Sequence, residues 1–200
     1  MKNVLVINSS LSGAKGNSNI LTNKLVARLQ AEHPALSITE RDLSAMNLPH
    51  LTAQEMQAWS VDKSERSAEQ AALANLSDSF IAELQQADAI IIGMPMYNFG
   101  VPSTFKAWID RVARAGVTFK YTETGPVGLL QNKKVYVLAA RGGIYLGTPK
   151  DSQSQYLKDV LSFIGLDNVE FVYAEGLAMG GDSAQSAWSA AEQHLERLTA

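Results

Sequence analysis

Cysteine is absent from this 200-residue chain. Without cysteine the protein can form no disulfide, no thiolate metal site and no thiol nucleophile, and it suits a reducing compartment. Long apolar runs are also missing near the N-terminus, where the run at 4–7 is much shorter than a signal-peptide core or the roughly 20 residues that span a bilayer. We therefore expect a cytoplasmic protein that has no membrane partner.

A strong charge of either sign is absent too. The formal net charge is −3, from 17 Lys and Arg against 20 Asp and Glu, and the basic residues are scattered. Such a surface has no general attraction for nucleic acid or anionic lipid, so neither is expected as a partner. The acidic residues show no spacing typical of a metal site, and we expect no metal. No repeat or break in composition divides the chain, which predicts one domain over residues 1–200.

Strand-like and helix-like segments alternate along the chain. Runs of β-branched and apolar residues, typical of strands buried on both faces, lie at 4–7, 89–92, 135–139 and 169–172, with a weaker run at 36–43. Helical patterns occupy 18–32, 67–86, 103–114, 152–163 and 182–198. This alternation predicts an α/β protein with a five-stranded, doubly wound parallel sheet in the flavodoxin-like order 2-1-3-4-5.

Local features refine this outline. Asn17 or Ser18 is expected to cap the first helix, and Pro102 to lie in the first turn of the third. An apolar stripe on the third helix predicts a core or dimer surface, while Asp110 and Arg111 are expected to be surface charges. The polar stretch 47–69 lengthens the second crossover and is either a surface excursion or an insert that contacts a partner. The stripe consists of Phe105, Trp108, Ile109 and Val112.

The first candidate loop follows the first strand. In an open α/β sheet, a ligand binds beyond the carboxyl ends of the strands, beside strand one. Residues 8–19 join this strand to the first helix and are rich in hydroxyls and glycines, which predicts a phosphate cradle; the alternative is a plain connection with good helix caps. A P-loop is excluded because Asn17 and Ser18 follow Gly16, and the fingerprint G-x-G-x-x-G is absent. A monophosphate held by neutral donors remains.

Two further loops lie at the same edge in the predicted strand order. Residues 93–102 have the apolar and aromatic surface to flank a flat ring, unless Met94, Met96 and Phe99 simply pack into the core. Residues 140–145 contain a Gly-Gly pair, which permits positive φ and a close backbone approach to a ligand. Because residues 140–145 are expected to lie next to the other two loops, we expect their backbone N–H groups to donate to the pyrimidine edge of a flavin.

Three motifs together resemble the FMN-dependent NADH-azoreductase family, whose members also reduce quinones. They lie at 95–99 (Pro-Met-Tyr-Asn-Phe), 113–119 (Ala-Arg-Ala-Gly-Val-Thr-Phe) and 141–143 (Arg-Gly-Gly), and the similarity runs over nearly the whole chain. The resemblance implies a flavodoxin-like fold, a non-covalently bound FMN and a homodimer with active sites at the subunit interface. It also implies a ping-pong reaction, in which NADH, or alternatively NADPH, reduces the flavin and leaves before a quinone or azo compound enters the same site.

The resemblance also assigns roles to residues of this sequence. The phosphate of FMN would be held by Ser10, Gly16, Asn17 and Ser18, the flavin ring would be lined by Met96, Tyr97, Asn98 and Phe99, and its polar edge would be met by Ala140, Arg141, Gly142 and Gly143. Tyr121, Tyr145 and Phe163 would shape the substrate pocket, Tyr121 and Phe163 across the dimer. Two positions depart from the family pattern. Relatives often have serine at the position of Ala140 and histidine at that of Tyr145, so a hydroxyl contact and an imidazole donor are lost.

Two other functions fit parts of the sequence. A flavodoxin-type electron carrier would bind FMN without a substrate pocket, but such carriers are typically strongly acidic, and the net charge here is mild. A hydrolase would need Ser9 or Ser10 beside His33, His50 or His194. This is disfavoured because the chain has no G-x-S-x-G elbow and two of the histidines fall on predicted helices.

Overall fold

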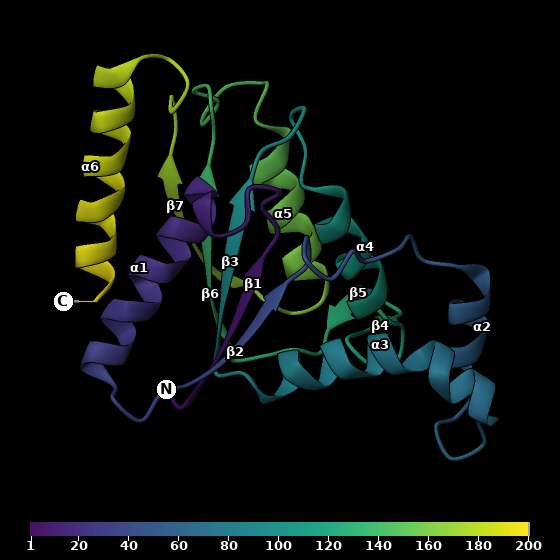
Figure 1. Cartoon of the computed structure of the whole chain (residues 1–200). Helices are drawn as coiled ribbons and strands as arrows, with labels where there is room; N and C mark the ends of the chain where they lie inside the picture. Colours follow the sequence, from purple (N-terminus) through teal and green to yellow (C-terminus); the bar gives the residue numbers. More distant parts are fainter. Residues whose placement is uncertain (200) are drawn as a thin grey trace.

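Five parallel strands form the central sheet of the computed structural model, which describes residues 1–199 (Figure 1). Their order across the sheet is β2-β1-β3-β6-β7. This is the predicted order 2-1-3-4-5, and the flavodoxin-like α/β fold is confirmed. The strands are β1 (Asn3–Asn8), β2 (Ser37–Asp42), β3 (Ala89–Pro95), β6 (Lys134–Ala140) and β7 (Asn168–Ala174).

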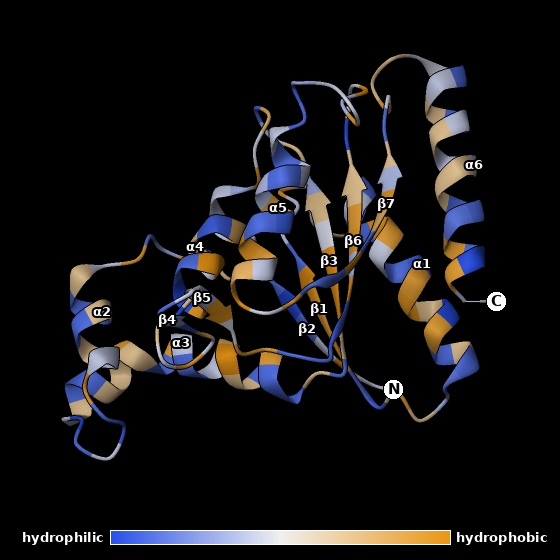
Figure 2. Cartoon of the chain, turned by 180° about the vertical axis from the view of Figure 1, so that it is seen from behind, coloured by the Kyte–Doolittle hydropathy of each residue, from blue (hydrophilic) through white to orange (hydrophobic). Residues whose placement is uncertain are grey.

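Helices cover both faces of this sheet, because alternate residues of each central strand face opposite sides. In β1, Val4 and Val6 pack toward α1 and α6, whereas Leu5 and Ile7 pack toward α3, α4 and α5. Figure 2 shows the result as apolar strands at the centre, surrounded by helices of mixed polarity. The helices are α1 (Asn17–Glu32), α2 (Ala53–Ser60), α3 (Ala68–Gln86), α4 (Ser103–Val112), α5 (Ser152–Phe163) and α6 (Gly181–Leu198), with a short 3-10 turn, η1 (Gly13–Lys15).

The apolar stripe on α4 belongs to the core, as one of its two readings predicted, since all four side chains are buried. The prediction for Arg111 was wrong: its side chain is fully buried and pairs with Glu55. Asp110, by contrast, is partly exposed and pairs with Lys106 on the same helix. The helix ends at Val112, two residues earlier than expected, because Ala113 leaves the helical conformation.

Both predictions for helix starts were off by one position or more. Gly16 is the N-cap of α1, no side chain caps that helix, and Asn17 and Ser18 already belong to it. Pro102 is the N-cap residue of α4 rather than a member of its first turn. The uncapped N–H groups at the start of α1 therefore remain free for another acceptor.

The polar stretch 47–69 is an excursion packed against the rest of the molecule. It contains α2, an eight-residue helix that begins with a capping box between Thr52 and Glu55. Figure 1 shows α2 at the right-hand edge of the molecule, beside the first turns of α3. Arg111 donates hydrogen bonds to the carbonyl oxygens of Pro49 and His50 as well as to Glu55, so one buried guanidinium anchors the excursion to α4.

A hairpin that the sequence analysis did not predict lies between α4 and β6. Its strands, β4 (Phe119–Thr122) and β5 (Gly125–Gly128), form a separate antiparallel pair. The hairpin packs closely on the turn after α5, since a Cβ built on Gly128 would lie 2.0 Å from the backbone nitrogen of Gly165. Among residues 1–199, no helix is both long and apolar enough to cross a membrane.

Candidate functional site

The three candidate loops meet in one pocket of about 260 Å³ at the carboxyl ends of β1, β3 and β6. Nine of the predicted cofactor-binding residues line it: Ser10, Gly16, Asn17, Ser18, Met96, Tyr97, Ala140, Arg141 and Gly142. Five residues to which the sequence analysis gave no binding role complete the lining: Ser12, Lys15 and Pro95, which lie within the predicted loops, and Leu177 and Ala178, which lie outside them. The last two follow β7, the fifth strand of the sheet, whose carboxyl end also lies at this edge.

The first loop wraps its polar groups around one end of the pocket. Gly13 has φ of +53° and opens the turn η1, and Asn19 Nδ2 donates to the Gly13 carbonyl at 2.9 Å. The loop delivers the N-terminus of α1 to the pocket, where the first amides of the helix have no partner within it. Ser10 and Ser18 are almost fully buried beside these amides.

The chemistry of this loop fits an anion. Its donors are serine hydroxyls, helix-terminal amides and the ammonium group of Lys15, and no acidic residue lines the pocket. The fit is tight, because a Cβ built on Gly16 would lie 2.2 Å from Ser10 Oγ. Only glycine at this position allows the Ser10 hydroxyl to stay where it is, so the residues present suit a phosphate group.

The second loop is held in an unusual turn beside this cradle. Asn98 and Phe99 have φ of 48° and 67°, a left-handed conformation that is uncommon outside glycine. The Leu11 N–H donates to the Tyr97 hydroxyl at 3.0 Å, which joins the second loop to the first. Met94 is fully buried, so the core-packing reading holds for that residue. Phe99 is 50% exposed, Met96 lines the pocket, and the same reading is wrong for both.

The third loop differs from expectation in two respects. Neither Gly142 nor Gly143 has positive φ. A Cβ built on Gly143 would lie 2.8 Å from the Tyr145 hydroxyl, so glycine at this position lets the Tyr145 side chain keep its place. The Arg141 side chain is buried in contact with residues of α5 and Glu175, so Arg141 offers the pocket its backbone rather than its charge.

The three aromatic residues predicted for a substrate pocket do not line this one. Tyr145 lies close by and makes an edge-to-face contact with Phe99 at 5.7 Å between ring centres. Tyr121 and Phe163 lie elsewhere, where both contact Phe119, with ring centres 5.6 and 4.2 Å from its own. Tyr121 is 73% exposed, so its ring is available to a second molecule. Of the other predicted residues, Asn98 and Gly143 also lie beside the pocket without lining it.

The chain matches the family model described as a flavodoxin-like fold over residues 2–198. It is 54% identical over 198 residues to the FMN-dependent NADH:quinone oxidoreductase of Pseudoalteromonas atlantica, covering 99% of this chain and 98% of the relative. The protein of the same name from Alteromonas mediterranea is 52% identical over 199 residues, covering 100% and 99%. This chain belongs to the FMN-dependent NADH:quinone oxidoreductase family.

Solved structures agree with this family assignment. An azoreductase from Bacillus anthracis str. Sterne superposes with a TM-score of 0.89 at 29% identity, covering 100% of this chain and 99% of the other. An FMN-dependent NADH-azoreductase from Bacillus anthracis str. Ames Ancestor, solved in complex with FMN, gives a TM-score of 0.86 at 25% identity with both chains fully covered. The resemblance that the sequence motifs predicted is confirmed.

The alternative hydrolase function would need a histidine base beside a serine at this pocket. No histidine lines the pocket. His194 of α6 hydrogen-bonds to Glu170 of β7, and His33 is the C-cap residue of α1. Ser9 Oγ donates to the Gly93 carbonyl, so its hydroxyl serves the backbone. Neither Ser9 nor Ser10 hydrogen-bonds to a histidine in the described structure, so the base that a serine nucleophile needs is not in place.

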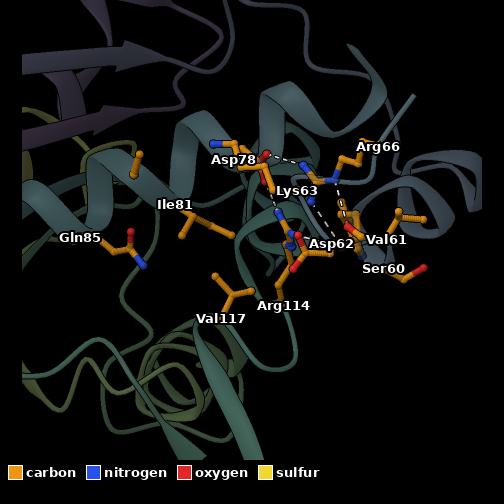
Figure 3. A pocket seen from close by; sticks show the side chains of 12 residues that line it. Ser60, Val61, Asp62, Lys63, Arg66, Asp78, Ile81, Gln85, Arg114 and Val117 are labelled. Carbon is orange, nitrogen blue, oxygen red and sulfur yellow. Dashed lines mark hydrogen bonds and ion pairs between the residues drawn. The ribbon is translucent and has the colours of Figure 1, made fainter. Parts of the chain in front are cut away.

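A larger pocket, of about 510 Å³, lies between the excursion, α3 and residues 114–117 (Figure 3). Three of its charged side chains, Arg66, Asp78 and Arg114, hold these segments together. Asp78 receives hydrogen bonds from Arg66 at 2.6 Å and Arg114 at 2.5 Å, and Arg114 lies over the Trp59 ring. Burial raises the pKa of Asp78, but the two arginines outweigh burial and hold that pKa below its ordinary value. The charged side chains of this second pocket therefore connect the excursion to α3 and residues 114–117, which is a structural role.

Proposed function

We propose that this protein is an FMN-dependent enzyme that transfers two electrons from NADH to quinones and azo compounds. The observation that carries the proposal is the tight anion cradle around Gly16, which opens onto a pocket built by the three loops at the carboxyl ends of the strands. The names of the relatives support the same cofactor, donor and acceptors. Family membership makes the chain an oxidoreductase.

The residues around the pocket divide the work of holding FMN. Ser10, Gly16, Asn17 and Ser18 hold the phosphate, with added donors from Ser12 and the positive charge of Lys15. Met96, Tyr97, Asn98 and Phe99 flank the flavin ring, and the backbone of Ala140, Arg141, Gly142 and Gly143 meets its polar edge. When bound, FMN supplies the capacity to take a hydride from the nicotinamide and to pass two electrons to an acceptor.

The protein's own contribution is placement and electrostatics. The lining carries no acidic residue, so the pocket accommodates negative charge without repulsion. Ala140 offers only its backbone where relatives often have serine. Tyr145, edge-on to Phe99, takes the position of a histidine, so no imidazole is available there to deliver a proton to the acceptor.

We also propose that the enzyme is a homodimer, in which Tyr121 and Phe163 complete the substrate pocket of the partner. These rings are absent from the lining of their own chain's pocket, and Tyr121 is 73% exposed in the single chain. Sedimentation analysis tests the assembly. A monomer with full activity at low concentration would refute this part of the proposal.

One shared pocket for donor and acceptor gives ping-pong kinetics. Initial rates at several fixed quinone concentrations, plotted against NADH in double-reciprocal form, should give parallel lines. Intersecting lines would mean that donor and acceptor bind together, which a shared site forbids. Replacing NADH with NADPH in the same assay measures the preference between the two donors.

The test of the cofactor comes before the kinetics. The purified protein is supplemented with FMN, desalted and examined by visible absorption, and NADH is then added without oxygen. Retained flavin peaks that bleach promptly support the proposal, whereas a protein that retains no flavin refutes it. Flavin that is retained but not bleached by NADH would instead support an electron carrier reduced by another protein. The predicted cytoplasmic location, which the lack of cysteine supports, is tested by cell fractionation.

A further inference from the structure

The first turn of α5 lies between the second and third loops, and Gln153 in this turn contacts both of them. This side chain is only 1% exposed. Its amide nitrogen donates to the carbonyl oxygens of Pro95 at 2.9 Å and Gly100 at 3.0 Å, which lie near the two ends of the second loop. Its amide oxygen accepts a hydrogen bond from Arg141 Nε at 3.2 Å, in the third loop. One buried glutamine thus joins both loops.

The Arg141 guanidinium extends this connection through the interior. It donates to Ser154 Oγ at 2.8 Å and to Glu175 at 2.9 Å, lies 3.1 Å from Asp151, and lies over the Tyr173 ring. Burial raises the pKa of Asp151, but hydrogen bonds from Ser154 and Arg141 outweigh burial and hold it below its ordinary value. The Asp151 carboxylate therefore stays ionised at neutral pH, and its contact with the guanidinium is maintained.

Glu175 completes the connection on the far side of the third loop. The carboxylate that pairs with Arg141 also accepts hydrogen bonds from the backbone amides of Tyr145 at 3.0 Å and Leu146 at 3.1 Å. The third loop is therefore held at its start by the arginine and at its end by the same carboxylate. A chain of charge-assisted hydrogen bonds in a buried setting is stiff, because each unmade bond would leave a polar group unsatisfied.

We propose that Gln153, Arg141 and Glu175, the anchoring network, are positioning residues that set the spacing of the two loops around the flavin ring. The proposal rests on the proposed function, since it concerns the same pocket. Neither Gln153 nor Glu175 lines the pocket, so both act through the backbone groups they hold. The network determines where the ring lies relative to the backbone donors at its polar edge, and hence how well those donors stabilise charge on it.

The variant Gln153→Glu tests the network from the side of the second loop. Glutamate has the same shape and still accepts from Arg141, but it has no N–H for the carbonyl oxygens of Pro95 and Gly100 and places a carboxylate oxygen against them. Gln155→Glu is the control for the added charge, because Gln155 is exposed on the same helix and its side chain hydrogen-bonds only to Asp159, away from both loops. Glu175→Gln tests the other side, since three donors face that carboxylate and an amide nitrogen there has no acceptor.

Flavin affinity is measured on the full-length apoprotein by fluorescence titration with FMN and with riboflavin. We expect each network variant to weaken both flavins by the same factor of at least 10, which is about 1.4 kcal/mol, because the defect lies at the ring and not at the phosphate. The visible circular dichroism and the midpoint potential of the bound flavin should also change. A role limited to fold stability would lower the melting temperature of the apoprotein and leave the spectrum and potential of the bound flavin unaltered.

The outcomes separate this proposal from the proposed function. If the wild type binds FMN and both variants match it in affinity, spectrum and potential, the anchoring network has no positioning role and only this proposal fails. If the wild type itself binds no flavin, both proposals fail. Should Gln153→Glu not fold, Glu175→Gln decides the question by the same measurements.

Discussion

Gly16→Ala is the sharpest perturbation of the phosphate cradle. Gly16 has φ of −67° and ψ of 133°, which alanine adopts without strain, so the only new element is the methyl group. That methyl carbon would lie 2.2 Å from Ser10 Oγ and 2.7 Å from Ser10 Cβ. Because this is far inside van der Waals contact, the Ser10 side chain must turn away from the cradle or the loop must shift.

The expected loss follows from what Ser10 contributes. A hydrogen bond to a charged group contributes about 1.5–3 kcal/mol, so losing the Ser10 hydroxyl should weaken FMN binding about 10- to 150-fold. Riboflavin lacks the phosphate and should bind to the variant as it binds to the wild type. The ratio of the two dissociation constants therefore isolates the phosphate site from the rest of the pocket.

The assay is fluorescence titration of the apoprotein with each flavin. Gly181→Ala is the control, since a Cβ built on Gly181 meets nothing within 4 Å and its φ is ordinary. That variant should bind both flavins normally. Wild-type FMN affinity in Gly16→Ala would refute the assignment of Ser10 and Gly16 to the phosphate. An equal loss for FMN and riboflavin would show that the methyl group disturbs the whole pocket instead.

Three further predictions concern stability. Gly128→Ala should lower the free energy of unfolding, measured in urea, by about 1–3 kcal/mol or more. Its Cβ would lie 2.0 Å from the Gly165 backbone nitrogen, so the backbone itself would have to move. Arg111→Ala should cost about 3–5 kcal/mol, since it leaves the Glu55 carboxylate and two carbonyl groups without their buried partner, and should speed proteolysis within residues 47–66. Asp78 has a pKa below its ordinary 3.8 in the folded chain, so its stabilising contribution should be complete above about pH 4 and lost as the pH falls through the folded value.

Matched variants check the reasoning behind each of these. Gly181→Ala again controls for the added methyl group, and Lys106→Ala, which removes a partly exposed ion pair, should cost at most about 1 kcal/mol. Asp78→Asn should flatten the acid limb of the stability curve. An Arg111→Ala protein with wild-type stability, or an acid limb that Asp78→Asn leaves unchanged, would contradict the roles given to these groups.

The extent of sequence-based prediction differs between the sheet and its connections. The central strands were found because both of their faces are buried, which demands unbroken apolar runs such as Val4–Ile7. The hairpin at 119–128 was missed because its strands are four residues long, mostly exposed and interrupted by Gly and Pro, so no periodic signal marks them. The excursion was recognised as polar, but helix α2 within it is too short and too exposed to stand out.

The candidate site shows a similar division. The loops were located by their position after strands, and the structure brings nine of the predicted residues to one pocket. Lys15 lay within the first loop and could have been noticed as its one cation. Leu177 and Ala178 carried no motif, and only the order of the strands indicates that the segment after β7 reaches the same edge.

The sequence by itself determined the alternation of strands and helices, the strand order and the family, because these depend on local periodicity and on short motifs. Tertiary structure decided where the charged side chains go. Arg111 and Arg141 look like ordinary surface or ligand arginines in the sequence, yet both are buried, because carboxylates distant in the chain, Glu55 and Glu175, meet them in the fold. Burial of a charge is favourable only with such a partner, and no local pattern reveals one that lies more than thirty residues away.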